Sequence, residues 1–256
     1  MSKIDKGDLL CGMDITLDVP CTIRVPHLRD IRSGTGVGFA AYYRHIHILS
    51  LDQETAFSAM GLTEYWQQLP PEEQQTMDLF TVLAAIPSSR QLLGEALSFF
   101  LCEKVVYSEA DHVFFLLDPS GDGERLPIGA VTSENYDRIR DAILQVNCLA
   151  SADTAPVTFR SQKAREIYEK IQLHKKAMNK PRGGDGSMTL PNIIGAVAAR
   201  HPSYNLLNIW DLTVYQLYDQ FARMNRIHQI DVSALRWAAW GKDPFDFALW
   251  YKDIDT

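Results

Sequence analysis

Three glycines near the N-terminus are the first residues whose spacing could support chemistry. Gly34, Gly36 and Gly38 lie in the segment SGTGVG, which superficially matches a phosphate-binding loop. A dinucleotide fingerprint requires a preceding strand, a third glycine one residue later than in this chain and an acidic residue further on. A P-loop ends in Gly-Lys-Ser/Thr, which is absent here. The glycines therefore predict a flexible turn between two helices.

A second candidate is the acidic segment DPSGDG, residues 118–123. Its Asp118, Ser120, Asp122 and Gly123 match the first six positions of a calcium-binding loop. The twelfth position of such a loop is a bidentate Glu, whereas this chain has Gly129 there, and the flanking residues have the pattern of strands. We therefore expect a hairpin turn in this segment.

His45 and His47 are the histidines closest together in the chain. They lie in a segment with helical spacing, which points them to different sides of the helix, and no neighbouring cluster completes a metal site. The G-x-S-x-G, H-E-x-x-H and kinase motifs are also absent from the sequence. We expect no catalytic residue, no metal site and no cofactor, and hence a protein that is not an enzyme.

The composition is typical of a soluble globular protein. Of the 256 residues, 46% are hydrophobic and 22% are charged, and no apolar run approaches the roughly eighteen residues of a membrane span. The first residues, MSKIDKGDLL, lack the pattern of a secretory signal, so we expect a cytoplasmic protein without a membrane partner. The cysteines form no CxxC pair and are expected to be reduced thiols: Cys11, Cys21, Cys102 and Cys148.

The periodicity predicts an α+β protein that is mainly α-helical. Short antiparallel strands are expected within 8–25 and 104–128, with a helical turn at Leu28 to Ile31. Asp52 is a predicted N-cap, and Pro71 begins a helix that Pro87 ends. The predicted helices are 37–49, 52–60, 71–86, 90–102 and 132–146. These elements form a predicted N-terminal body, residues 1–150.

Residues 151–187 are predicted to be a basic helix followed by a glycine-rich linker. The net charge of the chain is −7, yet the segment 158–182 has eight Lys or Arg and two Glu, a local +6. Such a patch could bind the phosphate backbone of a nucleic acid, or an acidic protein surface, or the acidic remainder of this chain. Its basic residues are Arg160, Lys163, Arg165, Lys170, Lys175, Lys176, Lys180 and Arg182.

Residues 188–256 are predicted to be a small helical module rich in aromatic residues. The pattern predicts helices at 190–200, from a cap at Asp211 or Thr213 to about 227, at 232–240 ending at Gly241, and from Pro244 onward. The aromatic rings could form the core of the module or anchor a partner. The candidate partner-binding residues are Trp210, Tyr215, Trp237, Trp240 and Trp250.

Three stretches resemble a protein type encoded in the tail-gene region of phages and prophages of Gram-positive bacteria, which is described as tail assembly chaperone-like. They are TIRVPHLRDI (residues 22–31), the lysine-rich FRSQKAREIYEKIQLHKKAMNK (residues 159–180), and NLLNIWDLTVYQLYDQFARM (residues 205–224) with the closing DPFDFALWYKDI (residues 243–254). Together they cover roughly a quarter of the chain. The family brings no catalytic residues.

The resemblance implies a non-enzymatic role in building a phage tail inside the host bacterial cytoplasm. The implied partners are the tape-measure protein, whose long helices expose apolar stripes, and the tail-tube protein. Two alternatives stay open: a nucleic-acid-binding protein that uses the basic segment, and a host-directed protein that acts against a bacterial defence. Self-association into a homo-oligomer and retention in the virion are also left open.

Overall fold

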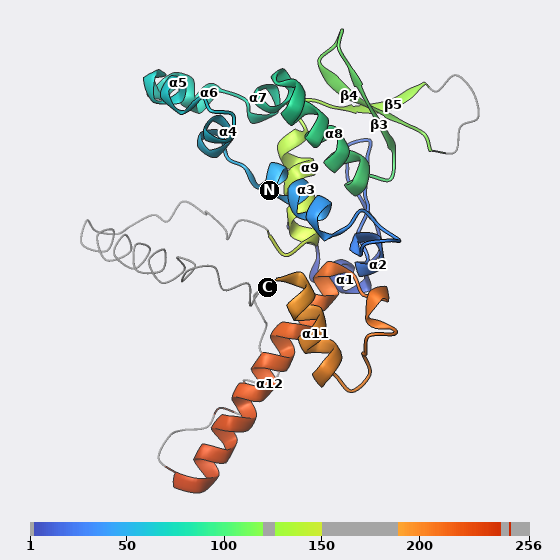
Figure 1. The fold of residues 1–256 in the computed structure, drawn as a ribbon, viewed down its shortest axis with the longest axis vertical. Coiled ribbons are helices and arrows are strands. Elements are labelled where there is room, and N and C mark those ends of the chain that lie inside the picture. The colour runs from blue at the N-terminus through green and yellow to red at the C-terminus, as the bar shows by residue number, and fades with distance from the viewer. Residues whose placement is uncertain (1–2, 120–125, 150–188, 242–245, 247–256) are drawn as a thin grey trace.

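The computed structural model describes residues 3–119, 126–149, 189–241 and 246 (Figure 1). Within these ranges the chain is mainly helical with a few short antiparallel strands, which confirms the predicted fold class. The division into segments 1–150, 151–187 and 188–256 stays a prediction, because the whole middle segment lies outside the described residues. The basic patch and Trp250 lie outside them as well.

The N-terminal segment contains a short helix, a hairpin and a helical turn. Helix α1 (Lys6–Cys11) begins after Asp5, whose carboxylate accepts a hydrogen bond from the Gly7 amide, and ends where Gly12 adopts a left-handed conformation. Strands β1 (Ile15–Thr16) and β2 (Thr22–Ile23) pair antiparallel, and α2 (Leu28–Ile31) follows. The hairpin and the turn agree with the sequence pattern, whereas α1 was not predicted.

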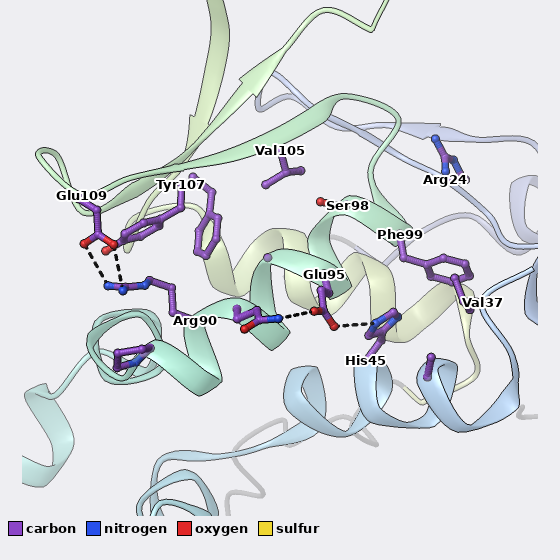
Figure 2. Close-up of a pocket in the computed structure, with 15 residues that line it drawn as sticks. Arg24, Val37, His45, Arg90, Glu95, Ser98, Phe99, Val105, Tyr107 and Glu109 are labelled. Atoms are coloured by element: carbon purple, nitrogen blue, oxygen red, sulfur yellow. Dashed lines mark hydrogen bonds and ion pairs between the residues drawn. The ribbon is translucent and has the colours of Figure 1, made fainter.

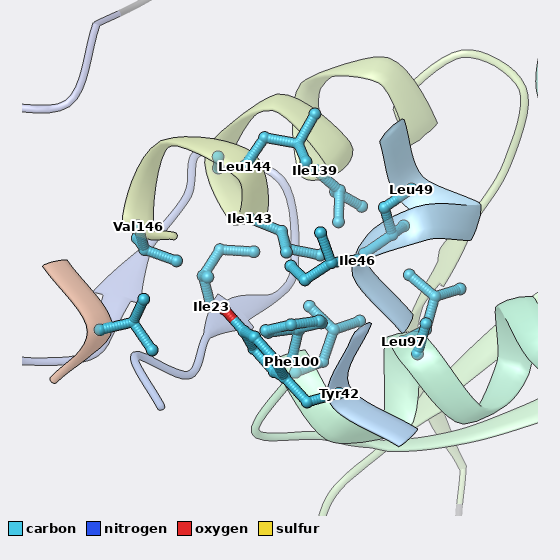
Figure 3. Close-up of a cluster of buried hydrophobic side chains, with 14 of the residues drawn as sticks. Ile23, Tyr42, Ile46, Leu49, Leu97, Phe100, Ile139, Ile143, Leu144 and Val146 are labelled. Atoms are coloured by element: carbon cyan, nitrogen blue, oxygen red, sulfur yellow. The ribbon is translucent and has the colours of Figure 1, made fainter. Parts of the chain in front are cut away.

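The centre of the molecule is built from three helices. They are α3 (Phe39–Ser50), α8 (Pro87–Phe100) and α9 (Tyr136–Val146). Figure 3 shows how their apolar side chains meet around β2. The labelled residues in this core are Ile23, Tyr42, Ile46, Leu49, Leu97, Phe100, Ile139, Ile143, Leu144 and Val146, all of them buried.

Two polar interactions connect α3 to α9. The Tyr42 hydroxyl donates a hydrogen bond to Oδ1 of Asn147 (2.9 Å), and the Asn147 amide group donates in turn to a carbonyl one turn earlier (2.7 Å). Arg140 donates to the carbonyl oxygens of Leu49 (2.6 Å) and Leu51 (3.0 Å), which would otherwise lack partners at the end of α3. The contacts satisfy buried polar groups and set the position of α9 against α3.

Between α3 and α8 the chain forms a peripheral group of four short helices. It consists of α4 (Gln53–Ala59), α5 (Thr63–Gln68), α6 (Pro71–Thr76) and α7 (Leu79–Ala85). Asp52 caps α4, as predicted. Helix α5 falls where no helix was predicted.

The prediction of one continuous helix over residues 71–86 is wrong. The chain leaves the helical conformation at Met77, and Asp78 begins α7 by accepting a hydrogen bond from the Thr81 amide (2.8 Å). The predicted start of the next helix at 90 is also wrong, because Pro87 is the first residue of α8. The fixed φ of proline and its missing N–H are compatible with the first turn of a helix, and the same properties end a preceding helix.

The sheet is formed by β3 (Lys104–Ser108), β4 (Val113–Leu117) and β5 (Pro127–Val131). All neighbours are antiparallel and the strand order is β3-β4-β5, which agrees with the predicted β-element. Helix α8 packs on this sheet at Gly94, where an added Cβ would lie 3.1 Å from the Phe114 ring. The absence of a side chain at Gly94 therefore permits the close approach of helix and strand.

The described C-terminal elements pack on the N-terminal body. They are α11 (Leu190–Arg200), the 3-10 helix η2 (Ile209–Asp211) and α12 (Val214–Trp240). Their buried apolar residues belong to the same core as α3, α8 and α9. The Leu190 amide donates to the Tyr43 hydroxyl (2.9 Å), and His27 forms an isolated β-bridge with Thr213. The described part of this region thus shares its core with the body.

The prediction of two separate helices, up to about 227 and over 232–240, is wrong. Helix α12 runs without interruption through 27 residues. The intervening residues HQID contain neither Gly nor Pro, so nothing in the backbone forces a break. The predicted cap at Thr213 and the predicted end at Gly241 are both confirmed.

Gly195 provides a test of helix propensity without packing. It lies inside α11, and an added Cβ would contact nothing within 4 Å. We expect Gly195→Ala to raise the free energy of unfolding by about 0.5–1 kcal/mol, since Ala favours a helix interior over Gly. Urea unfolding followed by circular dichroism measures the change. The matched substitution Gly94→Ala is expected to destabilise, because its Cβ meets Phe114; equal effects of the two would contradict the described packing.

Candidate protein-binding surface

Helix α12 starts from a well-defined cap on the body. The Thr213 side chain accepts a hydrogen bond from the Gln216 amide (3.2 Å), and the Gln216 side chain accepts one from the Thr213 amide (2.9 Å). The same Gln216 side chain donates to the carbonyl of Leu10 at the end of α1 (2.8 Å). The cap and its contact with α1 therefore fix the direction in which α12 leaves the body.

Four residues in the first half of α12 are buried. Val214, Leu217 and Asp219 have no exposed surface, and Tyr215 is also buried. The Asp219 carboxylate accepts two hydrogen bonds from the Arg223 guanidinium, at 2.7 and 3.1 Å, which compensates for taking this charge out of water. This half belongs to the core and positions the rest of the helix.

Helix α11 covers α12 only as far as His228. The two helices pack side by side, and an Arg200 Nη2 at the end of α11 lies 3.2 Å from Nδ1 of His228. In Figure 1 the part of α12 beyond α11 extends away from the body. The open part of α12, residues 227–240, is thus presented by the body without being packed into it.

The open part of α12 is rich in exposed apolar side chains. The exposed fractions are 71% for Leu235, 68% for Trp240, 46% for Trp237, 41% for Val232 and 40% for Ile227. A helix that is apolar on more than one side is normally buried. This stretch therefore has the character of an interface and not of a solvated surface.

Most apolar side chains of the open part lie on two sides of the helix, and Trp240 lies between these sides. We name the first the Leu235 face: His228, Val232, Leu235 and Ala239, which are spaced by four, three and four residues. The second is the Trp237 face: Ile227, Ile230, Ala234 and Trp237, spaced by three, four and three residues. At 100° per residue the two faces are about 150° apart, so one partner helix cannot cover both.

The structure places the predicted partner-binding residues in different environments. Trp237 and Trp240 are exposed on α12. Trp210 is half-buried; its indole N–H donates to the Leu206 carbonyl (2.8 Å), and the Arg32 guanidinium lies 5.2 Å from its ring centre. Tyr215 is part of the core, so it does not contribute to an exposed surface in this conformation. Leu235 and Val232 were not singled out from sequence, although their spacing contained the signal.

A separate groove of about 1000 Å³ runs along α8 between α3 and β3 (Figure 2). Arg90 forms an ion pair with Glu109 (3.0 Å), and its guanidinium lies 4.7 Å from the centre of the Tyr107 ring. Glu95 faces His45 at 4.0 Å. Two charged groups of the groove, Arg90 and Glu109, thus pair with each other, and we take the exposed helix as the stronger candidate for a binding surface.

His45 is the titratable group that the sequence singled out in this groove. Its side chain is buried, and its Nδ1 has no hydrogen-bond partner in the described structure. Burial lowers the pKa of His45 below its ordinary value of 6.5, an effect that Glu95 opposes and Arg44 reinforces. His45 is therefore neutral in the folded protein at pH 7.

The lowered pKa predicts how stability depends on pH. Well above pH 6.5 His45 is neutral in both the folded and the unfolded protein and does not change the stability. As the pH falls through 6.5, the unfolded chain binds a proton at this residue more readily than the folded chain does, which lowers the free energy of unfolding. We expect the free energy of unfolding of the wild type to fall more steeply from pH 7 to pH 5 than that of His45→Gln. Urea unfolding at several pH values measures both slopes. Parallel slopes would show that His45 does not titrate differently in the two states.

Within the described ranges there is neither a grouping of metal ligands nor a helix suited to a membrane. No three His, Cys, Asp or Glu side chains in those ranges are grouped so that they could hold a metal ion. The segment that resembles a calcium loop lies mostly outside them. No helix in the same ranges combines the length and the hydropathy that crossing a membrane requires.

The C-terminal part of the chain matches a known protein-family model. Residues 176–255 match the family model described as the YomV second domain, and this range contains α11, η2 and α12. No curated protein and no solved structure matches the chain. YomV is a protein of the phage and prophage regions of Gram-positive bacteria. The C-terminal part of this chain, including the exposed helix, is therefore similar to a domain of phage-associated proteins.

Proposed function

We propose that this protein is a non-enzymatic phage tail morphogenesis protein, similar to a tail assembly chaperone, that binds the tape-measure protein or the tail-tube protein. The observation that carries the proposal is the open part of α12, a helix with exposed tryptophan and aliphatic side chains that the body holds away from its core. The phage-associated match to the same segment supports it.

The physical reason concerns the chemistry of the partner. A tape-measure protein is a long helical chain with apolar stripes that must stay soluble until the tail tube surrounds it. An exposed helix with an apolar face can cover such a stripe by side-by-side helix packing. Trp237 is a suitable anchor on the Trp237 face, because tryptophan is enriched among residues that dominate binding energy.

Co-expression with the tape-measure and tail-tube proteins of the same phage, followed by affinity capture, tests the proposal. We expect the wild type to retain one of them and the double variant Ile227→Ala/Trp237→Ala to lose at least about tenfold in affinity, which corresponds to about 1.4 kcal/mol. The matched control is Leu206→Ala/Leu207→Ala, which removes apolar side chains that are 61% and 91% exposed elsewhere. Failure of the wild type to capture either protein would overturn the proposal.

A further inference from the structure

The Leu235 face continues the side of α12 that is already packed in its first half. Leu217, Phe221 and Met224 precede His228 at the same helical spacing, and all three pack in or against the core. Helix α11 ends at Arg200, where it contacts His228. Beyond this contact the same side of α12 carries Val232 and Leu235, both exposed. The apolar side of α12 therefore extends further than α11, the helix that covers its first half.

The position at which α11 ends restricts what can cover the Leu235 face. From His228 to Trp240, the last thirteen residues of α12, the helix is about 20 Å long at 1.5 Å per residue. A helix lying on this stretch reaches the end of α11 and cannot continue, because α11 occupies the space beyond. The occupant must therefore present a helix that ends at this point. Helix α12 itself ends at Gly241, one residue after the stretch.

We propose that the Leu235 face binds the same face of a second copy of this chain, with the two α12 helices antiparallel about a two-fold axis. In this arrangement Val232 of each copy lies opposite Leu235 of the other, and His228 lies opposite the small Ala239. The contact is isologous, as in most two-fold dimers. The C-terminal end of each α12 then lies next to the C-terminal end of α11 in the other copy.

Charge and steric fit both favour the antiparallel arrangement. The carbonyl end of a helix carries a partial negative charge, and antiparallel pairing places that end of α12 beside Arg200 at the end of the other copy's α11. Parallel pairing on the same face would place the first half of the second α12 where α11 lies. The proposed dimer contact does not use the Trp237 face, so the second copy and the proposed tail partner would bind different sides of α12.

The mass of the full chain in solution tests the dimer. We expect light scattering after size exclusion, in a concentration series up to about 0.1 mM, to approach twice the 28.9 kDa of one chain. Leu235→Glu places a charge in the centre of the contact and is expected to give monomers at every concentration. Leu207→Glu is the matched control, since Leu207 is 91% exposed on a loop, and it is expected to dimerise like the wild type. A monomeric wild type, or an equal response of the two variants, would overturn the proposal.

Cysteine cross-linking tests the orientation in a Cys11→Ser background, which removes the exposed native thiol. Chains carrying His228→Cys and differently tagged chains carrying Ala239→Cys are mixed and oxidised. Antiparallel pairing predicts a disulfide between the two kinds of chain and little between two Ala239→Cys chains, whose substituted positions are about 16 Å apart along the axis. Efficient linkage of Ala239→Cys to itself would indicate parallel helices and contradict the inference.

Discussion

Replacing Leu97 by alanine is expected to lower the free energy of unfolding by about 3 kcal/mol. Leu97 lies on α8 at the centre of the core, has no exposed surface, and faces side chains from α3 and α9 (Figure 3). The cost combines the lost transfer free energy of the removed atoms with the cavity they leave, which three helices cannot close by a local shift. Urea unfolding followed by circular dichroism measures it.

The control for this prediction is Leu207→Ala, the same change on an exposed loop. Because Leu207 is 91% exposed, its substitution is expected to change the free energy of unfolding by less than about 0.5 kcal/mol. If Leu97→Ala cost no more than this control, α8 would not pack against α3 and α9 in the way described.

Replacing Arg223 by methionine is expected to destabilise the protein by about 2–3 kcal/mol. The variant keeps much of the aliphatic side chain but removes both donors from Asp219, whose carboxylate is 1% exposed. An uncompensated buried charge typically costs about 3–5 kcal/mol. We expect the lower figure because Arg223 itself is 41% exposed, so water can reach part of the site after the change.

Two further variants separate this ion pair from general effects on α12. Asp219→Asn in the Arg223→Met background is expected to recover part of the loss, because a neutral amide is less costly to bury than a carboxylate. Arg226 lies three residues after Arg223 on α12, and Arg226→Met is expected to change the free energy of unfolding by less than about 0.5 kcal/mol. Equal losses for Arg223→Met and Arg226→Met would mean that Asp219 does not depend on Arg223.

Local signals in the sequence determined the elements whose ends carry a chemical marker. Asp52, Thr213 and Gly241 mark helix ends that the structure confirms, because a capping side chain or a left-handed glycine acts within a few residues of its own position. The antiparallel strands of the β-element were also predictable, since β-branched and aromatic runs alternate with turn residues. The overall class followed from these elements.

Markers with two meanings misled the prediction. Pro87 indicated an end and proved to be a beginning, and Asp78 separates two helices inside one continuous apolar pattern. In both cases the choice depends on whether the neighbouring apolar residues pack on α3, α8 or the sheet. That information is tertiary, because propensity differences of under about 1 kcal/mol per residue are easily overridden by burial.

For the candidate surface, the sequence alone determined that the C-terminal region is helical and rich in aromatic residues. Only the tertiary structure decided which of those residues are exposed. Tyr215 and Trp237 have similar local signals, yet the body and α11 cover the first half of α12 and stop at His228. Exposure is a property of what packs nearby, and residues 190–200 and 214–240 become neighbours only when the chain has folded.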